Sequence, residues 1–328
     1  MRVGLDLSPL TQTRAGTARY LRGLLAELER TAGIELERFA FGGSSRAATL
    51  ARDTWWYLGA LPRRSRAARL DVLHCPTFRA PLTTPVPLVV TVHDLAVLRH
   101  PETFNRWTRG YSRLLVPRVV RAAARVIAVS SFTKEEVVRL IGLPEAKVRV
   151  VPNAVGEPFT AEGPAADGEF VLAVGTLEPR KNLARLVEAA RRSKLELRVV
   201  GARGWQGVQV GGDGIRWLGE VDDAELARLY RGALCLAYPS VYEGFGIPVL
   251  EAMACGTPVV TSAGGGTREV ADGAAVLVDP LDPGAIAAGI QEAIARRDEL
   301  RALGRERAAR FTWRAAADAT VDVYREVA

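Results

Sequence analysis

Short apolar runs that alternate with helical patterns are the feature that most constrains the fold of this 328-residue chain. The runs are continuously apolar, as strands buried on both faces of a parallel sheet are. Helical stripes lie between them, and Thr133 with Glu136 predicts a capping box at the start of one helix. The predicted strands are 2–7, 72–74, 88–93, 126–130, 148–151, 170–175, 197–201, 215–218, 233–238, 258–261 and 275–278.

The strand–helix alternation occurs twice, which indicates an α/β protein with two Rossmann-like, doubly wound parallel-sheet domains. Residues 150–170 are rich in Pro, Gly and Ala and lack periodicity, so they indicate a linker. We therefore predict an N-terminal domain over 1–155, a second domain over 156–310 and a final helix within 311–328. Because open α/β sheets bind ligands beyond the carboxyl ends of their strands, we expect the site in a cleft that the two domains face.

Several classes of protein are disfavoured by the composition. No apolar run approaches the roughly 18 residues that a membrane-spanning helix needs, and the N-terminus shows no signal-peptide pattern. The three cysteines, Cys75, Cys235 and Cys255, are far apart, so they predict neither a disulfide framework nor a metal site. The three histidines also lack metal-ligand spacing. We expect a cytoplasmic protein without a metal.

Residues 239–258 place two carboxylates, Glu243 and Glu251, eight positions apart around a turn with two glycines. Pro248 and a short apolar pattern follow, and the pattern stops at Gly256, which indicates a short helix. The N-terminus of a helix favours an anion, and carboxylates accept hydrogen bonds from sugar hydroxyls. This combination predicts a site for a phosphorylated sugar or a nucleotide.

A second candidate segment is Gly175-Thr-Leu-Glu-Pro-Arg-Lys-Asn182, between a predicted strand and a predicted helix. Asn182 suits the N-cap of that helix. Arg180 and Lys181 would then lie at the carboxyl end of a strand, where two cations can hold a diphosphate. A solvated turn is the alternative reading of an isolated Arg-Lys pair.

These two segments resemble the retaining nucleotide-sugar glycosyltransferases of family 4, which have the GT-B fold. The spacing of Glu243 and Glu251 within EGFGIPVLEAMACGTPVV is similar to that family's hallmark, and AVGTLEPRKN looks like its diphosphate segment. VGARGW at 200–205, LGEVDDAELARLYRGA, AGGGTREVADGAAVLVDP and the final helix pattern also look like segments of the family. The resemblance implies that the helix within 311–328 crosses back to the N-terminal domain, that this domain is on the acceptor side and that 156–310 binds the donor. The second half of the chain resembles the family almost from end to end, and the first half resembles it more loosely.

The resemblance implies a role for several residues. Lys181 and Arg180 would bind the donor diphosphate, Glu251 the ribose hydroxyls and Glu243 the sugar hydroxyls. Many relatives carry arginine where this chain has Thr176, so Arg180 would replace that cation. The other implied donor contacts are Gly175, then Val221 and Asp223 near the base, and Gly244, Phe245 and Gly246 near the sugar or phosphate.

In the first half, Thr91-Val-His-Asp-Leu95 resembles the family's catalytic-centre segment, which would place His93 near the donor sugar. A structural role for His93 is the alternative, and His74 and His100 are interpreted as structural. Gly16 and Thr17 look like the loop that approaches the phosphate and the acceptor, although an ordinary loop-to-helix junction is nearly as good a reading.

The first half of the chain is basic. Residues 1–160 carry 24 Lys and Arg against 13 Asp and Glu, which leaves a net charge of +11. Aromatic residues accompany the arginines between 46 and 69, as at Trp55 and Trp56. This pattern allows contact with an anionic membrane or a lipid-phosphate acceptor, whereas an aromatic core beneath solvated arginines is the other reading.

The function predicted from these features is transfer of a hexosyl group, with mannose favoured, from a nucleoside-diphosphate sugar to a hydroxyl of a glycan, lipid-linked or small-molecule acceptor. Catalysis would be metal-independent and would depend on His93, Glu243 and Lys181. The alternatives are a sugar phosphorylase or epimerase on the same fold and a non-catalytic nucleotide-sugar-binding protein. A nucleic-acid partner is disfavoured because no recognised module is present.

Overall fold

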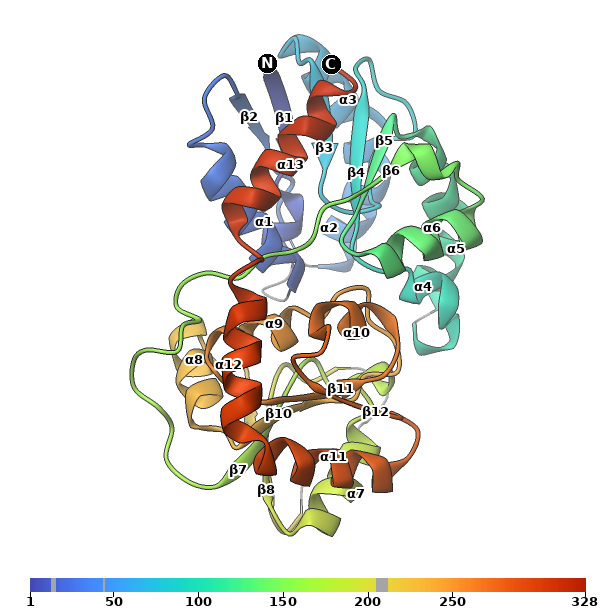
Figure 1. Ribbon diagram of the computed structural model, residues 1–328. Coiled ribbons are helices and arrows are strands. Elements are labelled where there is room, and N and C mark those ends of the chain that lie inside the picture. Colours follow the sequence, from blue (N-terminus) through green and yellow to red (C-terminus); the bar gives the residue numbers. More distant parts are fainter. Residues whose placement is uncertain (13–15, 44, 105, 205–211) are drawn as a thin grey trace. The chain divides into compact units, whose positions relative to one another are not determined.

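A computed structural model describes residues 1–12, 16–43, 45–104, 106–204 and 212–328 (Figure 1). The chain divides into two compact units. Unit 1 comprises Met1–Ala154 together with Trp313–Ala328, and unit 2 comprises Val155–Thr312. These divisions fall within two residues of the limits that composition and periodicity predict. Residues 151–169 contain no helix or strand, as the linker prediction requires.

Unit 1 contains a six-stranded parallel sheet in the order β2-β1-β3-β4-β5-β6. The strand β2 was not predicted, because its sequence ELERF alternates charged and apolar residues at the edge of the sheet. The other strands have both ends within two residues of the prediction. The strands are β1 (Arg2–Asp6), β2 (Glu35–Phe39), β3 (Val72–Cys75), β4 (Leu88–Val92), β5 (Arg125–Ala128) and β6 (Val148–Val150).

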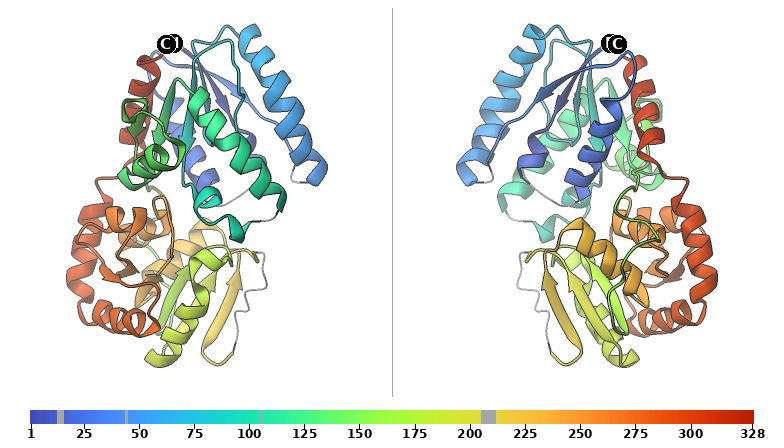
Figure 2. Two further views of the ribbon diagram at one scale, coloured as in Figure 1. Left: turned by 90° about the vertical axis from the view of Figure 1, so that its right-hand side faces the viewer. Right: turned by 90° about the vertical axis from the view of Figure 1, so that its left-hand side faces the viewer.

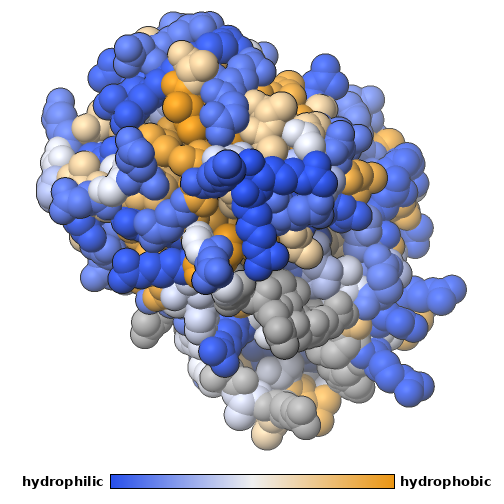
Figure 3. Space-filling model, turned by 90° about the horizontal axis from the view of Figure 1, so that it is seen from below, coloured by the Kyte–Doolittle hydropathy of each residue, from blue (hydrophilic) through white to orange (hydrophobic). Residues whose placement is uncertain are grey.

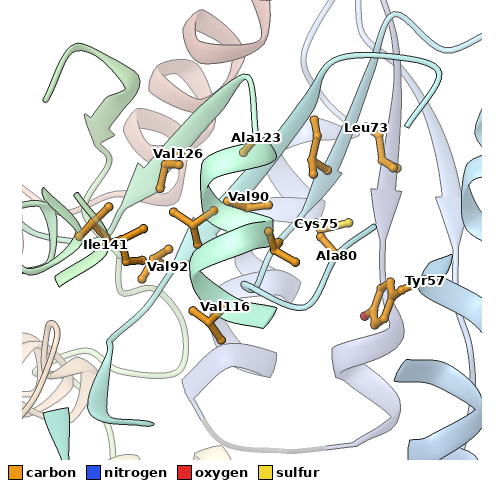
Figure 4. Close-up of a cluster of buried hydrophobic side chains, with 14 of the residues drawn as sticks. Tyr57, Leu73, Cys75, Ala80, Val90, Val92, Val116, Ala123, Val126 and Ile141 are labelled. Atoms are coloured by element: carbon orange, nitrogen blue, oxygen red, sulfur yellow. The ribbon is translucent and has the colours of Figure 1, made fainter. Parts of the chain in front are cut away.

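Successive strand residues point to opposite faces of this sheet, so unit 1 has two apolar layers. Helices α1 (Gly16–Leu28) and α13 (Trp313–Arg325) cover one face and pack against each other (Figure 2). The opposite layer is drawn in Figure 4, where Val116 of α5 lies among strand residues such as Val90 and Val92. The remaining helical segments of the unit are η1 (Ser8–Thr11), α2 (Arg46–Ala51), the π-helical η2 (Arg52–Ala60), α3 (Leu61–Ala67), α4 (Ala96–Arg99), η3 (Pro101–Thr103), α5 (Arg106–Ala122), α6 (Ser131–Ile141) and η4 (Glu145–Lys147).

Unit 2 contains a second six-stranded parallel sheet, in the order β12-β11-β10-β7-β8-β9. One face is covered by α7 and α11, whose Leu186 and Ile290 are buried against Val199 and Val260. The strands are β7 (Phe170–Val174), β8 (Glu196–Val200), β9 (Ile215–Gly219), β10 (Cys235–Tyr238), β11 (Val259–Ser262) and β12 (Val276–Val278). The helices are η5 (Pro179–Lys181), α7 (Leu183–Ser193), α8 (Asp223–Gly232), α9 (Ile247–Ala254), α10 (Gly265–Ala271), α11 (Pro283–Ala295) and α12 (Arg297–Ala308).

Helix α8 contacts β7, α9 contacts β10 and β11, and α10 contacts β11. Helix α12 packs against α9. Seen from below, the molecular surface is mostly hydrophilic, with smaller apolar areas between the polar side chains (Figure 3). Two doubly wound sheets are therefore present, each with its own core, as the alternation of strand and helix patterns predicts.

Two details at helix starts differ from the prediction. The capping box at Thr133 is wrong, because α6 begins at Ser131 and Ser130 Oγ accepts the N–H of Thr133 at 3.0 Å. Glu136 instead forms an ion pair with Arg139. Asn182 occupies the N-cap position of α7, but its side chain makes no capping bond. Its amide nitrogen donates to the carbonyls of Pro239 and Pro280, so it joins three loops.

Candidate functional site

Close backbone packing forms the loop that carries Arg180 and Lys181. Gly175 directly follows β7 and has a φ of +148°, and its N–H donates to the carbonyl of Val200 at 2.8 Å. A Cβ at Gly201, which has a φ of +150°, would lie only 2.0 Å from the oxygen of Gly175. Only glycine tolerates this approach and this conformation. The loop that follows β7 leads into η5. Arg180 and Lys181 lie in η5, beyond the carboxyl end of β7.

Both cations meet one carboxylate. The Lys181 Nζ lies 2.6 Å from Oε1 of Glu243, and an Arg180 guanidinium nitrogen lies 3.0 Å from the same oxygen. Lys181 also donates to the hydroxyl of Tyr238 at 2.5 Å, and Arg180 pairs with Glu178 at 2.9 Å. The side chains of Lys181, Arg180 and Glu243 are 12%, 16% and 11% exposed. We call these three residues the basic–acidic cluster.

The electrostatics of this cluster follow from its burial. Burial by itself would raise the pKa of Glu243, but the charges of Lys181 and Arg180 outweigh it and lower that pKa to about 2. For Lys181, burial lowers the pKa and the Glu243 carboxylate opposes the shift. The carboxylate is therefore ionised at neutral pH between two cations that can exchange partners with a phosphate group.

The turn before α9 brings Glu243 into this cluster. Gly246 has a φ of +100°, and a Cβ there would lie 2.7 Å from Thr267 Cγ2. The turn also rests on the start of α10, because the N–H of Gly266 donates to the carbonyl of Glu243 at 2.9 Å and a Cβ on Gly266 would lie 2.1 Å from the oxygen of Gly244. The triple glycine at 264–266 therefore packs directly against this turn. Three consecutive glycines are the sequence signal for such a close approach.

Glu251 lies about one turn inside α9, as its spacing from Pro248 predicts. The residue is fully buried, and its Oε2 accepts a hydrogen bond from the hydroxyl of Tyr230 at 3.1 Å. Sequence reasoning missed Tyr230, because a tyrosine on the apolar face of α8 reads as ordinary core. The ring of Tyr230 also meets Phe159 edge to face, with centroids 6.0 Å apart.

The remaining donor-side residues lie in the connection between β9 and α8. Val221 is partly buried and Asp223 is exposed at the first turn of α8. The cap of this helix is the neighbouring Asp222, which accepts the N–H of Glu225 at 2.8 Å. In the predicted loop 200–205, Trp205 lies outside the described residues.

His93, Gly16 and Thr17 belong to unit 1. His93 follows β4, and its Nε2 lies 3.0 Å from the carbonyl oxygen of Pro76. A carbonyl only accepts, so Nε2 carries the hydrogen, and burial, which lowers the pKa of this ring, favours the neutral form with an acceptor at Nδ1. Gly16 begins α1. A cavity of about 260 Å³ is lined by His93 together with Thr17, Gln12, Arg79, Asp94 and neighbouring residues.

His74 is buried and makes hydrogen bonds to Tyr324 and Thr91, which agrees with a structural role. Within the described ranges, no group of three or more His, Cys, Asp and Glu side chains is arranged to hold a metal ion. No helix in the same ranges combines the length and the apolar character needed to cross a membrane.

Comparison with known families divides the chain where the fold does. Residues 157–310 match the model described as glycosyl transferases group 1, and residues 14–156 match the model described as glycosyltransferase family 4. The chain is 31% identical over 298 residues to an O-antigen chain mannosyltransferase B of Escherichia coli, covering 80% of this chain and 77% of the relative.

A D-inositol 3-phosphate glycosyltransferase of Geodermatophilus obscurus is 34% identical over 275 residues. The match covers 73% of this chain and 61% of the relative. The chain therefore spans less than two thirds of this curated relative.

Solved structures share the architecture. Sucrose-phosphate synthase from Thermosynechococcus elongatus superposes with a TM-score of 0.81 at 22% identity, over 99% of this chain and 98% of that one. Anabaena Alr3699/HepE in complex with UDP-glucose superposes with a TM-score of 0.74 at 17% identity, over the full length of both chains. The two parallel-sheet units have the GT-B arrangement of elements, and the chain belongs to the family-4 type of glycosyltransferases.

Proposed function

We propose that this protein transfers a hexosyl group from a nucleoside-diphosphate sugar to a hydroxyl group, with retention of configuration. The observation that carries the proposal is the basic–acidic cluster, in which two largely buried cations share the Glu243 carboxylate beside the start of α9. A helix N-terminus and two cations suit a diphosphate, and a carboxylate suits sugar hydroxyls.

In the proposed reaction, the bond between the sugar's anomeric carbon and the diphosphate oxygen breaks while the acceptor oxygen bonds to that carbon on the same face. The departing phosphate oxygen takes the acceptor's proton. Lys181 and Arg180 stabilise the negative charge that develops on the diphosphate, so the reaction needs no metal. His93 orients the sugar through its neutral ring, and Glu251 holds the ribose after Tyr230 releases one of its oxygens.

For the donor we propose mannose carried by GDP. Supporting this choice, two relatives at 31% and 30% identity are named as O-antigen chain mannosyltransferases, from Escherichia coli and Salmonella typhimurium. UDP-glucose is the competing donor, because Alr3699/HepE of the same fold binds it. The acceptor would be a glycan, a lipid-linked sugar or a small molecule that offers a hydroxyl to the cavity beside His93.

Peripheral contact with an anionic membrane is part of the proposal. Leu50, Trp55 and Leu58 of α2 and η2 are 50%, 56% and 59% exposed, and arginines of α3 follow them directly. Apolar side chains next to cations suit the interface of an anionic bilayer. Co-sedimentation with vesicles containing phosphatidylglycerol, reduced in a Trp55→Ser, Leu58→Ser variant, is the expected result, and equal binding to uncharged vesicles contradicts the contact proposed here.

The first test is thermal stabilisation by UDP-, GDP-, ADP- and dTDP-sugars. A donor at 100 times its dissociation constant should stabilise the native state by about 2.7 kcal/mol. We expect the sugars of one base to raise the unfolding temperature of the native protein, and we expect no such rise in Lys181→Ala. The control Arg192→Ala should keep the rise, because Arg192 forms an exposed pair with Glu188 on the same unit. No shift with any donor rejects the proposed site.

Turnover distinguishes the remaining functions. Transfer to an added acceptor, with the anomeric configuration of the product read by NMR, supports the glycosyltransferase and tests retention. Release of sugar that requires inorganic phosphate indicates a phosphorylase, and conversion of donor without an acceptor indicates an epimerase. Donor binding without any turnover over a broad acceptor panel indicates a binding protein.

A further inference from the structure

A network of buried polar groups links helix α13 to strands β3 and β4, which lead to residues that line the His93 cavity. The Tyr324 hydroxyl of α13 lies 2.7 Å from His74 Nδ1 on β3. His74 Nε2 lies 2.8 Å from Thr91 Oγ1 on β4, and that oxygen lies 3.2 Å from the hydroxyl of Tyr20 on α1. All four residues are 0% exposed. The network therefore joins four elements, and its most distant members, Tyr20 and Tyr324, are 304 residues apart in sequence.

These polar groups lie within an apolar layer. Val3, Val72, Val89 and Val321 belong to the same buried cluster, so hydrophobic side chains could have filled the space. Burying polar groups is costly unless they are paired, whereas a paired network specifies one arrangement of the elements it joins. Burial lowers the pKa of His74 to about 3, so the ring is neutral and must donate through one nitrogen and accept through the other.

One ring contact and two short connections along the chain link this network to the cavity. The rings of Tyr20 and His93 meet edge to face, with centroids 4.8 Å apart and planes at 78°. Thr91 precedes His93 by two residues, so it fixes the end of the strand from which His93 follows. Thr17, which lines the cavity, lies three positions before Tyr20 on α1, on the same side of that helix.

We propose that Tyr324, His74 and Thr91 are positioning residues that hold Tyr20, and through it the ring of His93, in the orientation needed beside the cavity. The last helix is then part of the support of the unit 1 site and not only a cover for the sheet. The kinetic consequence rests on the function proposed above, whereas the orientation of His93 can be measured without any activity.

Replacing Tyr324 with phenylalanine tests the proposal, because the ring stays in the core and only the hydroxyl is lost. The chain has three histidines, His74, His93 and His100, so nitrogen-15 NMR of their rings gives three sets of signals. We expect the His93 ring signals to shift in Tyr324→Phe. Val323→Ala, on the same helix and also buried, is the control that leaves them in place.

In the transfer assay, Tyr324→Phe should lower kcat about tenfold with KM within about twofold, which is less than the roughly hundredfold cost of a 1 Å misplacement. Thr91→Val removes the middle hydrogen-bonding group of the network and should shift the same His93 signals. It serves as the test if Tyr324→Phe folds poorly. Unchanged His93 signals in both folded variants overturn the positioning role. A His93 shift in a protein that transfers no sugar supports the network and rejects only the proposed function.

Discussion

Removing the charge of Glu243 should destabilise unit 2 in a way that depends on pH. Glu243→Gln keeps the size of the side chain but leaves Lys181 and Arg180 without their shared carboxylate. The folded-state pKa of Glu243 is lowered from 4.5 to about 2, although burial alone would raise it. At 1.36 kcal/mol for each pKa unit, the ionised carboxylate contributes about 3 kcal/mol at neutral pH.

The sign of the pH dependence follows from the direction of that shift. Because the folded-state pKa is the lower one, the contribution is complete above pH 4.5 and is lost as the pH falls toward about 2. At pH 3.5, which is one unit into this window, about 1 kcal/mol of it should be gone. The difference between the native protein and Glu243→Gln should therefore narrow as the solution is acidified.

Denaturant unfolding at pH 7, 5 and 3.5, followed by circular dichroism, measures this difference. Glu188→Gln is the control, since Glu188 forms an exposed pair with Arg192 on the same unit and such pairs contribute about 0–1 kcal/mol. A difference between native protein and Glu243→Gln that stays constant from pH 7 to 3.5 would refute the lowered pKa of Glu243. A difference that widens would refute it as well.

Three further outcomes are expected. In Gly201→Ala the new Cβ would lie 2.0 Å from the oxygen of Gly175, so thermal unfolding should show a loss of about 1–3 kcal/mol, whereas Gly42→Ala, which meets nothing within 4 Å, should not; equal effects contradict the close packing. Tyr230→Phe removes a donor from buried Glu251 and should cost about 1–3 kcal/mol in denaturant unfolding, and an unchanged midpoint contradicts that bond. Burial raises the pKa of Cys235 and Cys255 to about 12 and that of Cys75 well above its usual range. A thiol reagent at pH 8 should therefore label these cysteines only after unfolding, and rapid labelling of the native protein contradicts their burial.

The buried strands could be predicted because each is a short, continuously apolar run. The edge strand β2 escaped, since Glu35, Glu37 and Arg38 face solvent wholly or in part and only Phe39 is buried. The helix start at α6 shows a second limit. Ser130 and Thr133 both suit a cap, and the actual end of β5 at Ala128 decides between them.

In the candidate site, the residues on local motifs were accessible to sequence reasoning and their partners were not. Glu243, Arg180 and Lys181 stand out through spacing and charge, but the meeting of both cations at one carboxylate oxygen depends on how β7 and β10 pair. Tyr230 and Tyr324 resemble core residues in the sequence. Their hydrogen bonds to Glu251 and His74 exist only because α8 packs on α9 and α13 packs on the sheet.

The divided sequence of unit 1 has a consequence for synthesis on the ribosome. Unit 2 is one continuous stretch, Val155–Thr312, so it can fold as soon as that stretch has left the exit tunnel. Unit 1 begins first but needs Ala317, Val321 and Tyr324, all at most 1% exposed, to complete its core. The part of the chain that is made first is therefore expected to be the last to reach its native state, and a nascent chain halted before α13 should leave the face that carries His74 open to chaperones.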